Sequence, residues 1–128
     1  MGELIVDIVV ENVMHRDMKV ESPALVDTGS SFLTLPMAWK EKLGEFEKNE
    51  EMTLELADQH TAQGILCGPV RVTIDGFEPV FTEVMFMEMA EREGRYEPLI
   101  GCIPLETGRL AVDLDSHTLV SLKRARVK

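Results

Sequence analysis

Apolar and polar residues alternate with a period of two along most of this chain, and no other feature constrains its fold as strongly. In residues 3–11 the side chains of Leu4, Val6, Ile8 and Val10 fall on one side of an extended backbone, and acidic side chains fall on the other. This spacing is typical of a strand with one buried face. Further extended runs follow at 18–26, 32–35, 52–57, 61–67, 69–74, 78–89, 109–114 and 118–122. We therefore expect an all-β fold with one or two short helices, closed into a small β-barrel.

Prolines, glycines and acidic residues divide these extended runs. Pro36 suits the first turn of a helix and Gly44 suits its C-terminal cap, which predicts one short helix over residues 36–43. The acidic stretch 44–51 is expected to be a solvated connection. Residues 58–60 separate two extended runs, and three residues is a length typical of β-hairpin loops. These segments therefore predict one short helix and one hairpin between the extended runs.

The length and charge of the chain limit its possible partners. At 128 residues it has the size of one domain, and we expect residues 1–128 to form a single unit. A net charge of −10 argues against nucleic acid, because phosphates require clustered Lys and Arg. No apolar stretch approaches the roughly 18–20 residues that span a bilayer, and the first residues lack a signal-peptide pattern. We expect a soluble, cytoplasmic protein, with a solvated basic tail at Lys123, Arg124, Arg126 and Lys128.

The sulfur-containing residues give no metal pattern. Cys67 and Cys102 stand alone, without the spacing or the neighbouring histidines of a metal site, and we expect both to be buried free thiols in a reducing compartment. Met85, Met87 and Met89 recur at a spacing of two. A soft-metal site can use such a spacing, but packing in a strand core explains it more simply. No metal or other cofactor is therefore expected.

The stretch ALVDTGSSF, residues 24–32, places a carboxylate at the end of an apolar strand. Asp27 is expected to be poorly solvated there, which proteins tolerate when the charge is paired or used. Thr28 supplies a hydroxyl, and Gly29 permits a positive φ or the close approach of another backbone. The serines that follow can donate hydrogen bonds to the carboxylate. The alternative is a structural turn in which Asp27 accepts its own backbone amides.

In its full context, ALVDTGSSFLTLP resembles the active-site loop of the aspartic proteases, and the single-domain layout is similar to their retropepsin-like branch. The resemblance covers about residues 3–122. It follows the order of an N-terminal strand pair, the Asp-Thr-Gly loop, a short helix, a flap hairpin and further strands. The last shared element is Leu99-Ile100-Gly101, two apolar residues and a glycine that lead into a short helix. The resemblance implies a closed barrel of the retropepsin type and an aspartic endopeptidase activity.

Aspartic proteases use two aspartates that share one proton: one polarises the scissile carbonyl while the other accepts a proton from the attacking water. This chain has one such motif, Asp27-Thr28-Gly29, and its nearest imitation, Glu-Thr-Gly at 106–108, lacks a preceding apolar strand. A two-fold homodimer supplies the second aspartate, because an isologous interface brings the same residue of each copy to the axis. The resemblance then implies that Thr28 forms a hydrogen bond across the interface and that Gly29 leaves room for a peptide substrate.

The hairpin around residues 57–60 stands in the position of the family's flap, a mobile lid over bound peptide. By resemblance, the substrate-binding residues of the cleft and flap are Ser30, Ile100, Gly101, Ala57, Asp58, Gln59 and His60. His60 has a simpler interpretation as an exposed turn residue. The flap tip lacks the glycine-rich run of viral members and the tyrosine of pepsin-like ones. A hydroxyl at Ser30 favours the charged carboxylate, which predicts an acidic activity optimum.

Two other functions are compatible with these residues. The chain can be a catalytically silent retropepsin-like module for dimerisation or peptide binding, since a fold does not fix a function. It can also be an unrelated β-barrel in which Asp27 is only a structural turn. Dimerisation separates this last alternative from the other two, and peptide cleavage separates the enzyme from the silent module.

Overall fold

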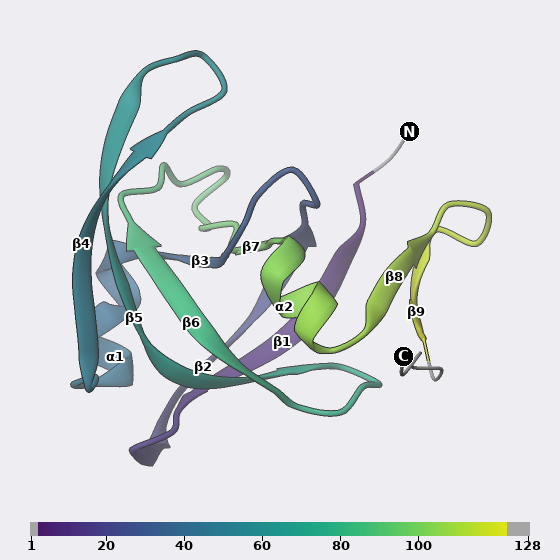
Figure 1. The fold of residues 1–128 in the computed structure, drawn as a ribbon, viewed down its shortest axis with the longest axis horizontal. Helices are drawn as coiled ribbons and strands as arrows, with labels where there is room; N and C mark the ends of the chain where they lie inside the picture. Colours follow the sequence, from purple (N-terminus) through teal and green to yellow (C-terminus); the bar gives the residue numbers. More distant parts are fainter. Residues whose placement is uncertain (1–2, 123–128) are drawn as a thin grey trace, which may run out of the picture.

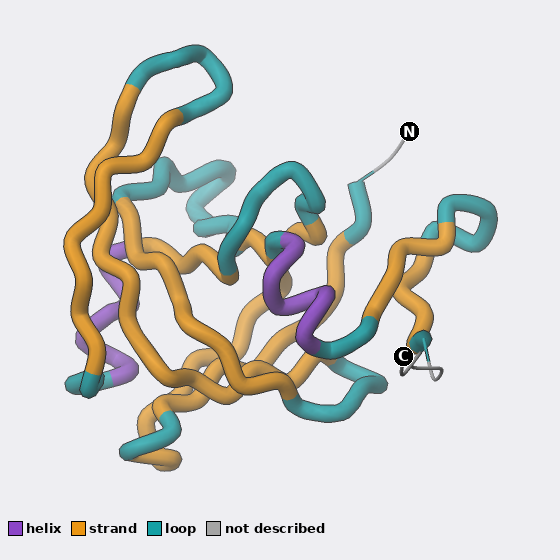
Figure 2. Tube along the Cα trace, viewed as in Figure 1, coloured by secondary structure: helices purple, strands orange, loops and turns teal. Residues whose placement is uncertain are grey.

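The structure, a computed structural model, describes residues 3–122, and strands make up most of this range (Figures 1 and 2). Seven of the described strands form one sheet: β1 (Ile5–Asn12), β2 (His15–Val26), β3 (Leu33–Pro36), β4 (Lys48–Glu55), β5 (Thr61–Ile74), β6 (Val80–Met87) and β7 (Leu99–Ile100). A separate two-stranded sheet consists of β8 (Leu110–Asp113) and β9 (Thr118–Ser121). The helical segments are short: η1 (Met37–Trp39), α1 (Lys40–Leu43) and α2 (Cys102–Thr107).

The large sheet closes into a ring. Its strand order is β1-β2-β7-β3-β6-β5-β4, and β1 also pairs with β5 over residues 8–12 and 70–74. Strand β4 lies outside the ring and pairs with the first half of β5, so that the two form a hairpin that extends beyond the ring (Figure 1). The predicted all-β fold with short helices and a closed sheet is confirmed.

The interior of the ring holds the apolar face that the alternation predicted. In β1 the side chains of Ile8 and Val10 are buried, whereas Asp7 points to solvent. Burying a residue of this size stabilises the fold by about 1.5–3 kcal/mol relative to leaving it exposed. The other strands of the ring contribute further core side chains, among them Leu33, Leu35, Val70, Val72, Val84, Phe86 and Ile100.

The helix predicted over residues 36–43 is shorter than expected. Pro36 is the last residue of β3, with φ −64° and ψ 141°, and the helical segment starts at Met37 as a 3₁₀ turn. A φ near −65° suits an extended backbone as well as a helix, so that Pro36 alone does not fix the start. Gly44 follows the helix at φ 78°, as predicted for its C-terminal cap.

Two expected boundaries in the middle of the chain are wrong. The stretch 44–51 is not only a solvated connection, because Phe46 is 7% exposed and belongs to the core, and β4 already begins at Lys48. The runs 61–67 and 69–74 form one continuous strand, β5, in which the pairing with β6 shifts register between Cys67 and Val70. With this shift in register, the single strand β5 takes part in both the hairpin and the ring.

Asn12 is a buried polar residue that connects the β1–β2 turn to the end of α1. Its Nδ2 donates to the carbonyl oxygens of Leu43 and Glu45, each at 2.7 Å, and its Oδ1 accepts a hydrogen bond from the N–H of Met14 at 2.9 Å. Buried amides are tolerated when they are satisfied in this way, and those carbonyls lie at a helix end, where partners are scarce. Asn12 therefore holds α1 against the outside of the ring.

The sulfur-containing residues are mostly structural. Both cysteines are free thiols; Cys67 is buried as expected, and its burial raises the pKa of the thiol, whereas Cys102 is only half-buried. Met85 is buried in β6, which confirms its predicted role in the core, and residues 3–122 contain no cluster of metal-ligating side chains. None of the described helices has the length and apolar character needed to cross a membrane. The basic cluster at 123–128 lies outside the described residues.

Candidate functional site

The loop of residues 27–32 joins β2 to β3 across the end of β7. Strand β7 lies between these two strands, parallel to β2, with Val26 opposite Ile100, and antiparallel to β3, with Leu33 opposite the same Ile100. The Asp-Thr-Gly-Ser-Ser loop therefore starts at the end of β2, passes the end of β7 and leads into β3. This topology brings the predicted catalytic loop and the predicted Leu-Ile-Gly element together, although about 70 residues separate them in the sequence.

Backbone hydrogen bonds fix the loop to β7 and to the start of α2. The donors and acceptors are Asp27 N–H to Ile100 O (2.9 Å), Gly101 N–H to Phe32 O (3.1 Å), Cys102 N–H to Ser30 O (2.8 Å) and Ile103 N–H to Ser31 O (2.9 Å). Phe32, Cys102 and Ile103 were not predicted as site residues. Their contribution is made by backbone groups, which no side-chain pattern reveals.

Gly101 lies directly beneath the loop. A Cβ atom at this position would lie 2.6 Å from the carbonyl oxygen of Ser30, 2.6 Å from the carbonyl carbon of Ser31 and 2.7 Å from the nitrogen of Phe32. Real Cβ atoms do not approach backbone atoms so closely, so that only glycine lets the loop rest on the end of β7. The predicted site residue Gly101 is thus a positioning residue for the loop.

Asp27 is half-buried in the single chain. Its Oδ1 accepts a hydrogen bond from the N–H of Gly29 at 3.1 Å, which is the interaction that the structural-turn alternative predicted. Within residues 3–122 neither serine hydroxyl donates to the carboxylate; Ser30 contributes its backbone instead. Thr28 and Gly29 are exposed. The motif presents its polar groups at the surface of the chain.

The predicted flap is the hairpin of β4 and β5, with its turn one position earlier than expected. The N–H of Leu56 donates to the carbonyl of His60 at 2.8 Å, so that the loop between them is Ala57–Gln59 rather than 58–60. The N–H of Gln59 donates to the carbonyl of Leu56 at 2.9 Å, and Gln59 has φ 71°. A turn followed by a residue in the left-handed region is a common three-residue hairpin loop.

The flap tip is polar and exposed. Asp58 accepts hydrogen bonds from the N–H of His60 at 3.0 Å and from its Nδ1, also at 3.0 Å, and both side chains are mostly exposed. The His60 side-chain hydrogen bond, followed by the backbone one, lowers the pKa of the Asp58 carboxyl. His60 is an exposed turn residue, as expected. Within the described residues no hydrogen bond joins the flap tip to the 27–32 loop, although both project toward the same edge of the molecule (Figure 1).

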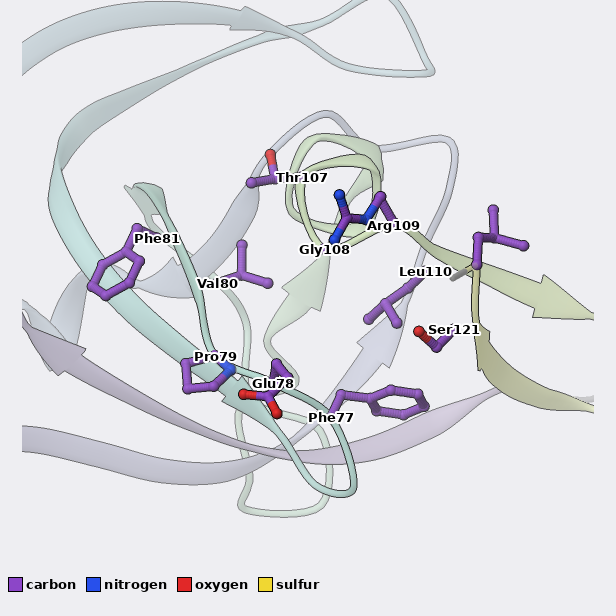
Figure 3. A pocket seen from close by; sticks show the side chains of 11 residues that line it. Phe77, Glu78, Pro79, Val80, Phe81, Thr107, Gly108, Arg109, Leu110 and Ser121 are labelled. Carbon is purple, nitrogen blue, oxygen red and sulfur yellow. The ribbon is translucent and has the colours of Figure 1, made fainter. Parts of the chain in front are cut away.

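Three surface hollows lie away from Asp27. The one in Figure 3 has a volume of about 450 Å³ and lies between the β5–β6 turn and the segment that joins α2 to β8, with Phe77, Val80 and Leu110 around it. Hollows of about 520 and 680 Å³ border the middle of β2, and the larger is also lined by Trp39 and Tyr96. Asp27 lines none of these three.

Comparison with known proteins supports the fold. No protein-family model matches the chain, and no curated protein matches its sequence. Among solved structures, the chain is similar to the EIAV protease complexed with the inhibitor HBY-793, with a TM-score of 0.59 over 82% of this chain and 86% of that one. The two sequences are 12% identical, so that the likeness concerns the backbone alone. This chain therefore has a retropepsin-like fold.

Proposed function

We propose that this chain is a homodimeric aspartic endopeptidase that hydrolyses extended peptide segments. Two copies of Asp27, one from each chain, share a proton and activate a water molecule between them. Like charges at such close range cannot both ionise easily, so that one carboxyl serves as acid while the other serves as base. The expected substrate is an unfolded peptide or protein segment, and no metal or other cofactor takes part in the step.

The observation that carries this proposal is the position of the Asp-Thr-Gly loop in a retropepsin-like fold. The loop lies across the end of β7, and four backbone hydrogen bonds hold it there. Fixed backbone bonds of this kind keep a catalytic group in place at little cost when the substrate binds. This chain combines the Asp-Thr-Gly motif, its support at Gly101 and the retropepsin-like fold. The combination points to an aspartic endopeptidase more specifically than the tripeptide alone.

The half-buried state of Asp27 in one chain fits this function. A carboxylate that must meet its copy lies at the surface of the monomer and becomes enclosed when the dimer forms. Thr28 and Gly29 are exposed beside it, so that Thr28 is available for a hydrogen bond to the partner and Gly29 for contact with substrate. The polar tip of the β4–β5 hairpin is the proposed lid, with Ala57, Asp58, Gln59 and His60 toward the peptide.

Cleavage of an unstructured peptide library between pH 3 and pH 7 tests the proposal. We expect wild type to cleave with an acidic optimum, and Asp27→Asn to lose the activity by a factor of about 10³ or more, since the shared proton and the general base disappear together. Thr28→Ser keeps the hydroxyl and is the matched control, expected to retain cleavage.

Two results contradict the proposal. Cleavage by Asp27→Asn at the wild-type rate would remove Asp27 from the mechanism. No cleavage by a folded, dimeric wild type would favour the alternative, a silent module for dimerisation or peptide binding. In that case a fluorescently labelled library, measured for binding instead of cleavage, identifies the peptide that the module holds.

A further inference from the structure

We propose that Gly64 is a positioning residue for the lid. Because Gly64 has no side chain, the β4–β5 hairpin packs against the ring closely enough for its tip to reach a peptide at Asp27. We call residues 53–63, the part of the hairpin that carries the tip, the lid arm. The inference rests on the proposed function, since a lid has a role only when a peptide is bound beneath it. It adds the residue that sets the angle between the lid arm and the ring.

Seen from the tip, Gly64 is the first residue of β5 that the ring holds. The pairing of β5 with β6 starts at Gly64, which lies opposite Met87, the last residue of β6. The pairing of β5 with β4 continues beyond this point, as far as Glu55 opposite Thr61. Figure 1 shows the hairpin extending past the end of β6. Within residues 3–122 the two strands of the lid arm pair only with each other, so that the direction of the arm is set at Gly64.

One side chain from the ring and one from the lid arm fill the space beside Gly64. A Cβ atom at this position would lie 2.7 Å from Sδ of Met85, 3.1 Å from the carbonyl oxygen of Phe86 and 3.2 Å from Cδ1 of Leu54. Met85 is only 1% exposed, so that its side chain has little room to move away in a close-packed interior. The ring and the lid arm therefore meet beside Gly64 at a separation that any side chain there would increase.

A small change at Gly64 has a larger effect at the tip. Five residues of extended strand, about 16 Å, separate Gly64 from Gln59, whereas neighbouring strands lie only about 4.8 Å apart. A shift of a few tenths of an ångström between β5 and β6 therefore tilts the lid arm and moves the tip several times further. Within the described residues no hydrogen bond joins the tip to the 27–32 loop, so that no such contact corrects the tilt. A displacement of about 1 Å far from the reacting atoms can lower a rate by about 10².

An alanine at Gly64 tests the inference. Residual dipolar couplings of the backbone amides, measured by NMR on the full chain, give the orientation of the lid arm relative to the ring. Gly64→Ala is expected to turn the arm by about 5° or more. It is also expected to raise KM for an extended peptide at least about fivefold, with kcat changed by less than about twofold. Gly68→Ala is the matched control on the same strand, since a Cβ there meets Glu83 at an ordinary 3.4 Å, and it is expected to behave as wild type.

The split between KM and kcat distinguishes positioning of the lid from a role in packing alone. A variant that is only less stable contains less folded enzyme, which lowers the apparent kcat and leaves KM unchanged. A lowered kcat in Gly64→Ala, with KM and the orientation of the lid arm unchanged, would show that this glycine serves packing alone and would contradict the inference.

A second test leaves Gly64 in place and acts on the lid arm. Leu54→Ala removes the arm's side of the contact with Met85 and is expected to change the orientation of the arm in the free protein and to raise KM by a similar factor. Thr53→Ala is its control, because Thr53 is exposed and its side chain points to the opposite face of the hairpin. Circular dichroism and thermal unfolding check that each variant is folded.

The outcomes separate this inference from the proposed function. A reoriented lid arm and a raised KM in Gly64→Ala and Leu54→Ala, with both controls unchanged, support it. If all four variants keep the orientation and the KM of wild type, the inference is wrong, while the proposed function stands. A wild type that cleaves no peptide overturns both. If Gly64→Ala is unfolded, the comparison of Leu54→Ala with Thr53→Ala decides alone.

Discussion

Gly101 has the backbone of residues 30–32 packed against its Cα, and this contact is the most restrictive single-residue feature of the candidate site. The neighbouring carbonyls and amides are also hydrogen-bonded to residues 100–103, so that they cannot move aside without losing those bonds. Flexible side chains can adjust around an added methyl group, but a hydrogen-bonded backbone adjusts poorly.

Gly101→Ala is therefore expected to lower the free energy of unfolding by about 1–3 kcal/mol and to lower peptide cleavage further than the loss of stability explains. Urea denaturation and cleavage of a peptide substrate measure the two effects. Gly68→Ala is the control, since a Cβ there meets Glu83 at an ordinary 3.4 Å. Equal stability of Gly101→Ala and wild type would show that the loop does not rest on this glycine.

At the scale of residues, the sequence predicted that the loop with Asp27 and the segment with Gly101 share one site, and the structure brings these two segments together. Asp27 and Gly101 were named because the long stretch 24–36 and the order of the elements resemble one family; the short patterns alone are weak. The role of Ser30 in bonding through its carbonyl, not its hydroxyl, depends on the arrival of Cys102 from a distant part of the chain.

Strand β5 is the element that connects the candidate lid to the body of the molecule. Its first half pairs with β4 in the hairpin, and its second half pairs with β1 in the ring. Because one continuous strand of 14 residues runs through both, the backbone of the hairpin is joined directly to the ring. The conformation of the tip then affects the position of the whole hairpin. That conformation depends on Gln59, whose backbone is in the left-handed region.

Substitutions at Gln59 test this dependence. Gln59→Val places a β-branched residue at φ 71° and is expected to lower the free energy of unfolding by about 1 kcal/mol. Gln59→Gly adopts that φ without strain and is expected to be at least as stable as wild type, apart from a small entropic term. Urea denaturation measures both. A Val variant as stable as the Gly variant would contradict the left-handed conformation.

At the scale of elements, periodicity predicted which segments are strands but not where they begin and end. Pro36 fits the end of a strand or the start of a helix equally well, and its pairing with Met87 on β6 decided between them. The expected break between 67 and 69 is absent because β6 continues to pair with β5 on both sides of it. Such boundaries depend on neighbours that the local sequence does not contain.

The ring as a whole closes between β1 and β5, and a charged cluster lies on this seam. Glu11 of β1 accepts hydrogen bonds from Arg71 of β5 at 2.9 Å and from Arg16 of β2 at 3.3 Å. Burial by itself raises the pKa of the Glu11 carboxyl, but the hydrogen bonds and charges of the two arginines outweigh it and hold the pKa below the ordinary value of 4.5.

The seam is therefore expected to weaken in acid. A carboxyl whose pKa is lowered by folding stabilises the protein above its unfolded value, and this contribution is lost as the pH falls through the lowered folded value. Wild type is expected to be more stable than Glu11→Gln by up to about 1 kcal/mol at pH 6, with the difference disappearing as the pH falls below the ordinary value of 4.5. Urea denaturation across this range measures the difference, with Glu51→Gln at an exposed position of β4 as the control.

A difference that stays constant with pH would show that Glu11 does not gain its stabilisation from the charged form. If the difference disappears as expected, the acidic conditions that favour the proposed chemistry are also those in which the ring is held least firmly. The stability of the seam then contributes to the lower pH limit of the proposed activity.

At the scale of the molecule, the fold class was predictable, and the order of the strands in the sheet was not. Alternation predicts strands and a closed core, but it does not say that β1 pairs with β5 or that β7 enters between β2 and β3. Strand β7 has only two residues, too few for a periodic pattern. The hairpin of β8 and β9 was predicted as two strands, whereas its separation from the main sheet was not.

The insertion of β7 between β2 and β3 also sets the order in which the molecule can become functional. Residues 100–103 provide the backbone partners that fix the 27–32 loop, and they are made by the ribosome more than 65 residues after it. Until they emerge, a growing chain already carries Asp27 but has nothing to hold it in place. For the proposed peptidase, this order of synthesis delays activity until the chain is nearly complete.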